Sequence, residues 1–202
     1  MMISALFVEK NGVYYNMPNV DPWDIERDAR LYNYDNPVIC HPPCQLWGKF
    51  AKVNYKRWGG DHNKPGNDQG CFESALNNLN RCGGVLEHPA FSYAWEKFSL
   101  PKPEKLGWKY ENGFYVCEVW QSAYGHKATK RTWLLYKGNK PPFELNWAKK
   151  KGFYQIGGCD QRGPQKNKTT LRHKHASATP LKFRNTLILL AQNTRCHNGI
   201  CF

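Results

Sequence analysis

Apolar and polar positions follow short regular patterns along the chain, and these patterns predict strands in five places. Residues 3–8 and 37–40 are apolar runs of a length typical of buried strands. Residues 85–87 form a third run, and residues 114–121 and 132–136 alternate between apolar and polar positions. The segments between these strands are long enough to hold helices.

Two segments repeat apolar residues at helical spacing. In residues 69–82 the apolar side chains share one face, Asp68 or Asn67 can cap the first turn, and Gly83-Gly84 ends the pattern. A second helix is predicted after Thr179-Pro180, with Leu187, Ile188 and Ala191 on its buried side. Strands alternating with helices predict a single α/β domain over residues 1–202, with a mostly parallel, Rossmann-like sheet flanked by helices.

Three predicted strands end in polar or reactive side chains. These ends are His41-Pro42-Pro43-Cys44-Gln45, Glu87-His88-Pro89, and Gln121 followed by Tyr124-Gly125-His126. Ligands of open α/β sheets bind beyond the carboxyl ends of the strands, so the three ends predict a site if the strands are parallel neighbours. Each cluster alone is also typical of a loop with turn-forming prolines and glycines.

Composition excludes two classes of protein. The chain has 202 residues, of which 41% are hydrophobic and 14% aromatic, which is too apolar for a disordered chain. It contains no run of 18 apolar residues, so a membrane span is not expected. The N-terminus lacks the basic region of a signal peptide, and we therefore expect a cytoplasmic protein with reduced cysteines.

The eight cysteines have two interpretations. Cys71, Cys82 and Cys117 lie in apolar segments, where a free cysteine packs as a small hydrophobic residue. Cys40 and Cys44 with His41, or Cys196 and Cys201 with His197, have the chemistry of zinc ligands but not the paired spacing of strong zinc motifs. We therefore expect no metal, with a structural zinc as the alternative.

Positive charge is concentrated in two stretches. The formal net charge is +13, and residues 149–178 form a predicted basic loop near the C-terminus. A second basic stretch, interleaved with aromatic residues, follows Cys44. Lysine and arginine neutralise phosphates while aromatic rings stack on exposed bases, so a nucleic acid, DNA above all, is the expected partner. The expected nucleic-acid contacts are Lys49, Lys52, Lys56, Arg57, Arg162, Lys166, Lys168, Arg172 and Lys174.

Three motifs, in order, resemble those of DNA cytosine-5 methyltransferases. Pro42-Pro43-Cys44-Gln45 after an apolar strand looks like their catalytic Pro-Cys loop. Glu87-His88-Pro89 is similar to their Glu-Asn-Val strand end, and residues 123–132 resemble their Tyr-Gly-x-Pro-Gln-x-Arg-x-Arg segment. The matches cover residues 37–138, and the pattern also resembles small bacteriophage-encoded methyltransferase-like proteins, for which the compartment would be the host cytoplasm.

The resemblance implies a methyltransferase-like fold, S-adenosylmethionine as the cofactor and a pyrimidine in DNA as the substrate. Cys44 would add to C6 of the base and Glu87 would hold N3, which makes C5 nucleophilic. His41 or His88 could lower the pKa of the thiol, and the base would be flipped out of a duplex or already unpaired. The implied substrate-binding residues are Pro43, Gln45, Trp47, Gln121, Tyr124, His126 and Lys130.

The chain departs from the family at two motifs. The family's first strand ends in Phe-x-Gly-x-Gly, which approaches the cofactor, whereas residues 7–12 read Phe-Val-Glu-Lys-Asn-Gly. In the third motif Ala128, Lys130 and Thr132 stand where the family has Gln, Arg and Arg. Three functions stay open: cytosine-5 methylation, a cysteine-dependent modification or deamination without S-adenosylmethionine, and an inactive module that binds DNA or blocks a host defence protein.

Overall fold

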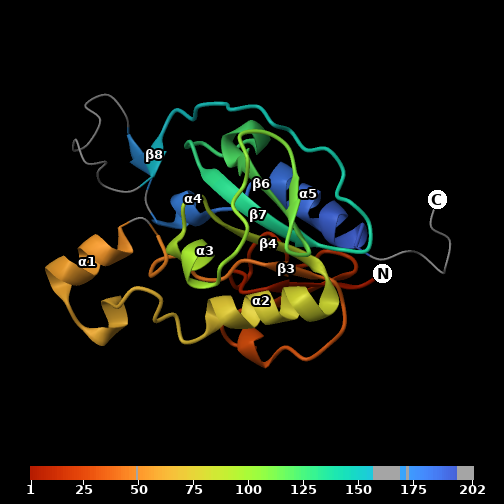
Figure 1. The fold of residues 1–202 in the computed structure, drawn as a ribbon, viewed down its shortest axis with the longest axis horizontal. Coiled ribbons are helices and arrows are strands. Elements are labelled where there is room, and N and C mark those ends of the chain that lie inside the picture. The colour runs from red at the N-terminus through yellow and green to blue at the C-terminus, as the bar shows by residue number, and fades with distance from the viewer. Residues whose placement is uncertain (49, 157–168, 172, 195–202) are drawn as a thin grey trace.

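Seven strands form one mixed sheet in the order β2-β1-β3-β4-β7-β6-β5 (Figure 1). The computed structural model describes residues 1–48, 50–156, 169–171 and 173–194. The strands are β1 (Ile3–Leu6), β2 (Val20–Trp23), β3 (Val38–Cys40), β4 (Gly84–Pro89), β5 (Lys109–Glu111), β6 (Phe114–Trp120) and β7 (Arg131–Lys137). Strands β2, β1, β3 and β4 are parallel to one another, and β7 is antiparallel to both β4 and β6.

Helices cover both faces of this sheet. The helices are α1 (Ala51–Trp58), α2 (Cys71–Cys82), α3 (Tyr93–Lys97), α4 (His173–Ser177) and α5 (Leu181–Gln192), with short 3-10 turns η1 (Ala29–Leu31), η2 (Asp61–Asn63) and η3 (Gln121–Tyr124). Strands β8 (Gln155–Ile156) and β9 (Thr170–Leu171) pair separately. Helix α2 packs on β3 and β4 from one side and α5 from the other, so the sheet is the middle of three layers.

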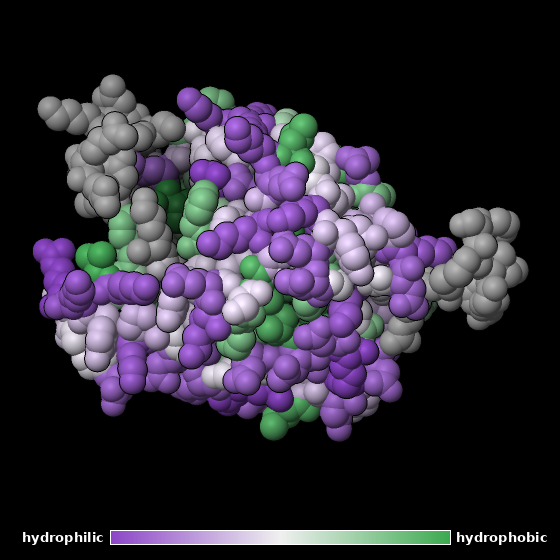
Figure 2. Space-filling view, viewed as in Figure 1, coloured by the Kyte–Doolittle hydropathy of each residue, from purple (hydrophilic) through white to green (hydrophobic). Residues whose placement is uncertain are grey.

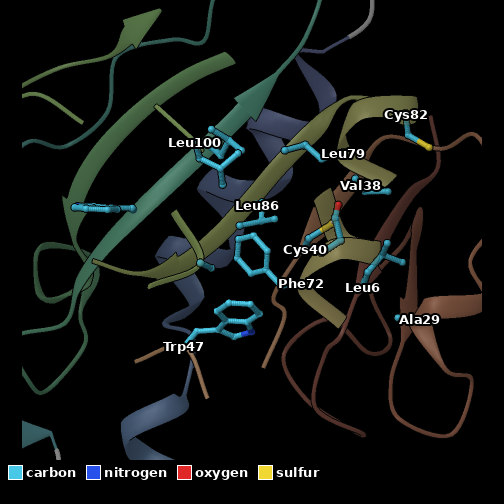
Figure 3. Packing of buried hydrophobic residues seen from close by; sticks show 14 of the residues in the cluster. Leu6, Ala29, Val38, Cys40, Trp47, Phe72, Leu79, Cys82, Leu86 and Leu100 are labelled. Atoms are coloured by element: carbon cyan, nitrogen blue, oxygen red, sulfur yellow. The ribbon is translucent and has the colours of Figure 1, made fainter. Parts of the chain in front are cut away.

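The alternation of side chains along the strands divides the core in two. Val38 and Cys40 of β3 and Leu86 of β4 pack with Phe72 and other residues of α2 (Figure 3). The intervening residues point the other way and pack with α5; these are Ile39, Val85, Phe183 and Leu187, among others. Because strand residues alternate between faces, His41 and Glu87 lie on the α5 side at the ends of their strands.

The predicted elements are confirmed with shifted ends: β4 and β7 extend beyond the predicted 85–87 and 132–136, whereas β1, β3, β6 and α2 are shorter than predicted. The strand predicted over 3–8 stops at Leu6, because Phe7 takes a left-handed backbone with φ 59°. Helix α2 starts at Cys71, and the Asp68 carboxylate accepts the backbone N–H groups of Gly70 and Phe72, as a capping residue does. The predicted α/β class with helices flanking the sheet is correct, but the sheet is parallel only from β2 to β4 and antiparallel from β4 to β5.

Cysteines occupy the core as expected at two of three positions. Cys82 and Cys117 are buried, whereas Cys71 at the start of α2 is half-buried. Cys40, Cys44, Cys71 and Cys117 are free thiols. Cys196 and Cys201 lie outside the described residues.

None of the helices within the described part of the chain has the length and apolar character needed to cross a membrane.

Candidate functional site

The three polar strand ends meet at one edge of the sheet. Strands β3 and β4 are parallel neighbours, and β6 runs in the same direction because both β4 and β6 pair antiparallel with β7. His41 directly follows β3, Gln121 directly follows β6 and Glu87 lies near the end of β4, so the three residues reach a common edge. The structure thus brings together one residue of each predicted cluster, although β7 separates β6 from β4 and the three strands are not all direct neighbours.

Hydrogen bonds join the three clusters into one chain of side chains. Cys40 pairs with Leu86 in the β3–β4 register, which places His41 beside Glu87, and His41 Nδ1 lies 3.0 Å from Glu87 Oε2. On the other side Gln121 Nε2 donates to Glu87 Oε1 at 2.9 Å and to Thr132 Oγ1 at 2.9 Å. Both oxygens of the Glu87 carboxylate are therefore held by side chains that directly follow β3 and β6.

Tyr14 completes the chain of hydrogen bonds at His41. Burial, with the Glu87 charge, raises the pKa of the Tyr14 hydroxyl well above its usual value, so the phenol keeps its proton. Its oxygen lies 2.8 Å from His41 Nε2. We assign the imidazole proton to Nδ1, from which it points to Glu87, and with this assignment the Tyr14 hydroxyl is the donor to Nε2.

Glu87 is ionised although it is only 7% exposed. Burial alone would raise the pKa of this carboxyl, but the Lys130 charge and the hydrogen bond from His41 outweigh burial and lower the pKa to about 2. At neutral pH the site therefore contains a fixed carboxylate. It cannot donate a proton, but it can accept further hydrogen bonds from a ligand.

Cys44 interacts electrostatically with Glu87 and Lys130. Two prolines end β3 and turn the chain, which leaves the Cys44 side chain half-buried between the exposed residues Pro43 and Gln45. Burial raises the pKa of the Cys44 thiol, the Glu87 carboxylate raises it further, and Lys130 lowers it. Lys130 stands just before β7 and its Nζ donates to the Ser177 carbonyl at 3.3 Å. We call the group of Cys44, Glu87, Lys130, His41 and Gln121 the Cys44–Glu87 site.

This coupling predicts opposite effects of two substitutions on thiol reactivity. Glu87→Gln removes the negative charge and should increase the rate of Cys44 alkylation by iodoacetamide near neutral pH, on the order of threefold. Lys130→Met removes the positive charge and should slow the reaction by a similar factor. Peptide mass spectrometry assigns each rate to its cysteine, and Cys71 in the same sample is the internal control. Equal Cys44 rates in all three proteins would contradict the proximity of these charges.

Four further residues predicted for the site make contacts within the fold. His88 alternates to the α2 side and lies against Phe72 and Trp95. Trp47 is buried in the same cluster and donates to Asp68. On the other side, Tyr124 accepts from the backbone N–H of Asn146 at 3.0 Å, and His126 Nδ1 accepts from that of Ala128 at 3.0 Å. These last two brace the loop between β6 and β7.

Sequence reasoning missed two members of the hydrogen-bonded chain. Thr132 shares a strand face with Lys130, so the alternation of β7 could have indicated it. Tyr14 lies in the loop between β1 and β2, where no periodicity places a side chain. Only tertiary packing brings it to His41.

A basic arm lies beside the site. Helix α1 and turn η2 stand out from the sheet (Figure 1), and hydrophilic side chains cover most of α1 (Figure 2). Lys52, Lys56 and Arg57 are exposed on this helix, as expected for phosphate contacts, and Lys52 Nζ lies 4.4 Å from the ring centre of Tyr93. A hollow of about 500 Å³ separates the arm from α3; it is lined by Trp47, Asp61, Lys64, Pro65, Gly66, Asn67, Tyr93 and Lys97.

The other expected nucleic-acid contacts fall outside the described side chains; these are Lys49, Arg162, Lys166, Lys168, Arg172 and Lys174. In the predicted basic loop over 149–178, residues 157–168 and 172 lie outside the described residues, and the remainder includes β8, β9 and α4.

Among the described residues no group of three or more His, Cys, Asp or Glu side chains could hold a metal ion. Comparison with known proteins identifies no relative: no family model, curated protein or solved structure matches the chain.

Proposed function

We propose that this protein is a nucleic-acid-modifying enzyme of the cytosine-5 type, which acts on a cytosine held beyond the carboxyl ends of β3, β4 and β6. The observation that carries the proposal is the position of Cys44, Glu87 and Lys130 in one electrostatic group at that edge. The four parallel strands with helices on both faces support a Rossmann-like, methyltransferase-like fold.

The chemistry begins with addition of Cys44 to the base. The thiol gives up its proton and a bond forms between Sγ and C6. The electrons of the C5–C6 double bond move to form a C4–C5 double bond, and those of the C4–N3 double bond move to N3, which takes up the proton lost by the thiol. Lys130 stabilises the thiolate, since its charge lowers the pKa of Cys44. Carbon C5 is then nucleophilic and can accept a proton or another electrophile, and loss of the C5 proton with cleavage of the Sγ–C6 bond restores the ring.

The ionised Glu87 favours cytosine over uracil. The N4 amino group of cytosine donates a hydrogen bond, whereas uracil has the acceptor O4 at that position, which a carboxylate would repel. When N3 becomes protonated in the adduct, N3–H and N4–H together can donate to the carboxylate. Glu87 thus stabilises the adduct more than the free base, which is the requirement for catalysis.

The arm offers a path for the strand that carries the base. Lys52, Lys56 and Arg57 on α1 can neutralise phosphates, and the half-buried ring of Tyr93 lines the adjacent hollow. A base within a duplex would have to leave the stack to reach Cys44. The net charge of +13 supports nucleic acid as the partner.

Hydrogen exchange at C5 tests the proposal without any knowledge of a group donor. Single-stranded DNA, duplex DNA and RNA containing cytosine are incubated with the protein in heavy water, and nucleoside masses report deuterium at C5. Exchange is expected with the wild-type chain and lost completely in Cys44→Ser. Cys71→Ser, which changes another half-buried cysteine, is the matched control and should exchange as the wild type does. Exchange that persists in Cys44→Ser would refute the role of this thiol.

A second candidate is a binding module without catalysis, as in an inactive phage protein that coats DNA or blocks host defence. The raised pKa of Cys44 favours it, because the thiol then stays protonated at neutral pH. DNA binding by the wild-type chain without any C5 exchange would select this candidate.

A further inference from the structure

The parallel part of the sheet reverses its order at β1. The chain passes from β1 to β2 on one side and then crosses to β3 on the other. Such a reversal opens a crevice beyond the carboxyl ends of the two central strands, which is where open α/β sheets bind nucleotide-like ligands. The resemblance to cytosine-5 methyltransferases would place S-adenosylmethionine here, in contact with the loop that follows β1.

Tyr14 lies across this crevice. The residue is 2% exposed and belongs to one apolar cluster with Ile3 and Ala5 of β1 and Ile39 of β3. Its hydroxyl reaches beyond the end of β3 to His41. The ring therefore covers the ends of both strands on the α5 side.

The loop that carries Tyr14 is fastened from two directions. Arg184 Nη1 on α5 donates to the Val13 carbonyl at 2.8 Å, and the backbone N–H of Val8 donates to the Trp23 carbonyl at 3.2 Å. Gly12, the single glycine of this loop, does not make room for a ligand either. A Cβ at Gly12 would lie 2.7 Å from the Glu9 carbonyl oxygen, so the close approach at this glycine is to the chain itself.

The carboxylate of Asp24, which directly follows β2, is also hydrogen-bonded within the protein. An acid at this position of a nucleotide-binding sheet holds the ribose hydroxyls of the ligand. Here Asp24 is 4% exposed; Oδ2 accepts from the Tyr15 hydroxyl, and Oδ1 accepts from the backbone N–H groups of Glu26 and Arg27. Three of the roughly four acceptor positions of this carboxylate are occupied by the protein itself.

We propose that Tyr14 and Tyr15 fill the place of S-adenosylmethionine, so that the Cys44–Glu87 site works without this cofactor and Tyr14 acts as a positioning residue for His41 and Glu87. The inference rests on the proposed function for the identity of the site. Of the three functions that the sequence leaves open, the absence of a cofactor place favours the two that need no methyl donor. These are a cysteine-dependent modification or deamination and an inactive binding module. It also gives the loop between β1 and β2 a role in the Cys44–Glu87 site.

Calorimetric titration of the full chain with S-adenosylmethionine and with S-adenosylhomocysteine tests the first half of the inference. We expect no saturable heat with either compound at millimolar concentration, and no effect of either compound on C5 exchange. Saturable binding in the micromolar range, or transfer of a labelled methyl group to DNA, would overturn the inference. These readouts do not depend on C5 exchange, so a failure of the proposed function remains distinguishable from a failure of this inference.

Tyr14→Phe tests the second half. The substitution keeps the ring in the crevice but removes the hydrogen bond to His41, so S-adenosylmethionine should still not bind. The pH profile of C5 exchange, or of Cys44 alkylation if exchange is absent, should shift relative to the wild type because His41 loses its hydrogen bond at Nε2. Tyr15→Phe, which removes the hydroxyl bonded to Asp24, is the matched control and should leave the profile unchanged. An identical profile in Tyr14→Phe and the wild type would refute the positioning role.

Discussion

Gly84→Ala is expected to prevent β3 and β4 from pairing and to leave almost no folded protein. Gly84 has a φ of 135°, and a Cβ at this position would lie 1.9 Å from the carbonyl oxygen and 2.7 Å from the nitrogen of Val38. Both atoms belong to the backbone of the neighbouring strand, so they cannot move away without breaking the β3–β4 ladder. The expected loss in the free energy of unfolding is more than about 4 kcal/mol, which is outside the ordinary range for single substitutions.

Gly113→Ala is the matched control for this prediction. Gly113 also has a positive φ, of 80°, but no atom lies within 4 Å of the Cβ that an alanine would add. Only the backbone strain remains, with a cost of about 1 kcal/mol. Chemical denaturation of both variants measures the difference. A Gly84→Ala protein as stable as Gly113→Ala would mean that β3 and β4 do not approach as described.

Acidification from pH 7 to pH 4 is expected to remove about 3 kcal/mol of unfolding free energy through His88 alone. The ring is 1% exposed, 5.1 Å from the Phe72 ring and 6.2 Å from the Trp95 ring, between centres. Burial lowers the pKa of His88 from 6.5 to about 4, against the opposing charge of Glu87. Below pH 6.5 His88 is protonated in the unfolded chain but remains neutral in the folded chain. The full contribution of this histidine to the unfolding free energy is therefore present above pH 6.5 and decreases as the pH falls toward 4.

His88→Phe tests this effect because the phenyl ring keeps the aromatic packing and cannot be protonated. The readout is the slope of unfolding free energy between pH 6.5 and pH 4, which should flatten even if the larger ring lowers stability at every pH. The exposed His62→Gln is the control and should keep the wild-type slope. The effect of Glu87 on stability can be distinguished from that of His88 by its pH range. The pKa of Glu87 is lowered from 4.5 to about 2, so this carboxylate affects the unfolding free energy at lower pH than His88 does. Identical slopes in His88→Phe and the wild type would exclude His88 as the origin.

The sequence predicts those parts of the fold whose hydrophobic pattern matches one period. Helix α2 is recognisable from its apolar face and from Asp68, and β3 from an apolar run that two prolines end. Strand β2 is not predicted from the sequence because it contains Pro22. A proline is tolerated there because β2 is an edge strand, whose outer side need not donate hydrogen bonds. Helix α1 has only Ala51 buried, so it carries no apolar stripe to detect.

The candidate site likewise contains some residues that the sequence predicts and others that it does not. His41 and Gln121 are predictable because each directly follows a strand, Cys44 because it lies in the loop after β3, and Glu87 because it lies near the end of β4. His88 is predicted for the site beside Glu87, but it lies within β4, where the alternation of side chains turns it to the opposite face and into the core. Tyr14 depends on a contact between a loop and a distant strand, which no local pattern encodes.

The bond from Arg184 to the Val13 carbonyl joins residues 171 positions apart. During synthesis, β1, β3 and β4 leave the ribosome well before α5, and the segment that bears Tyr14 is not tied to this helix until the helix docks. Arg184 lies in the first turn of α5, so docking of that turn completes the support of Tyr14 beside His41. The surroundings of the Cys44 thiol therefore depend on the meeting of segments that lie far apart in the sequence.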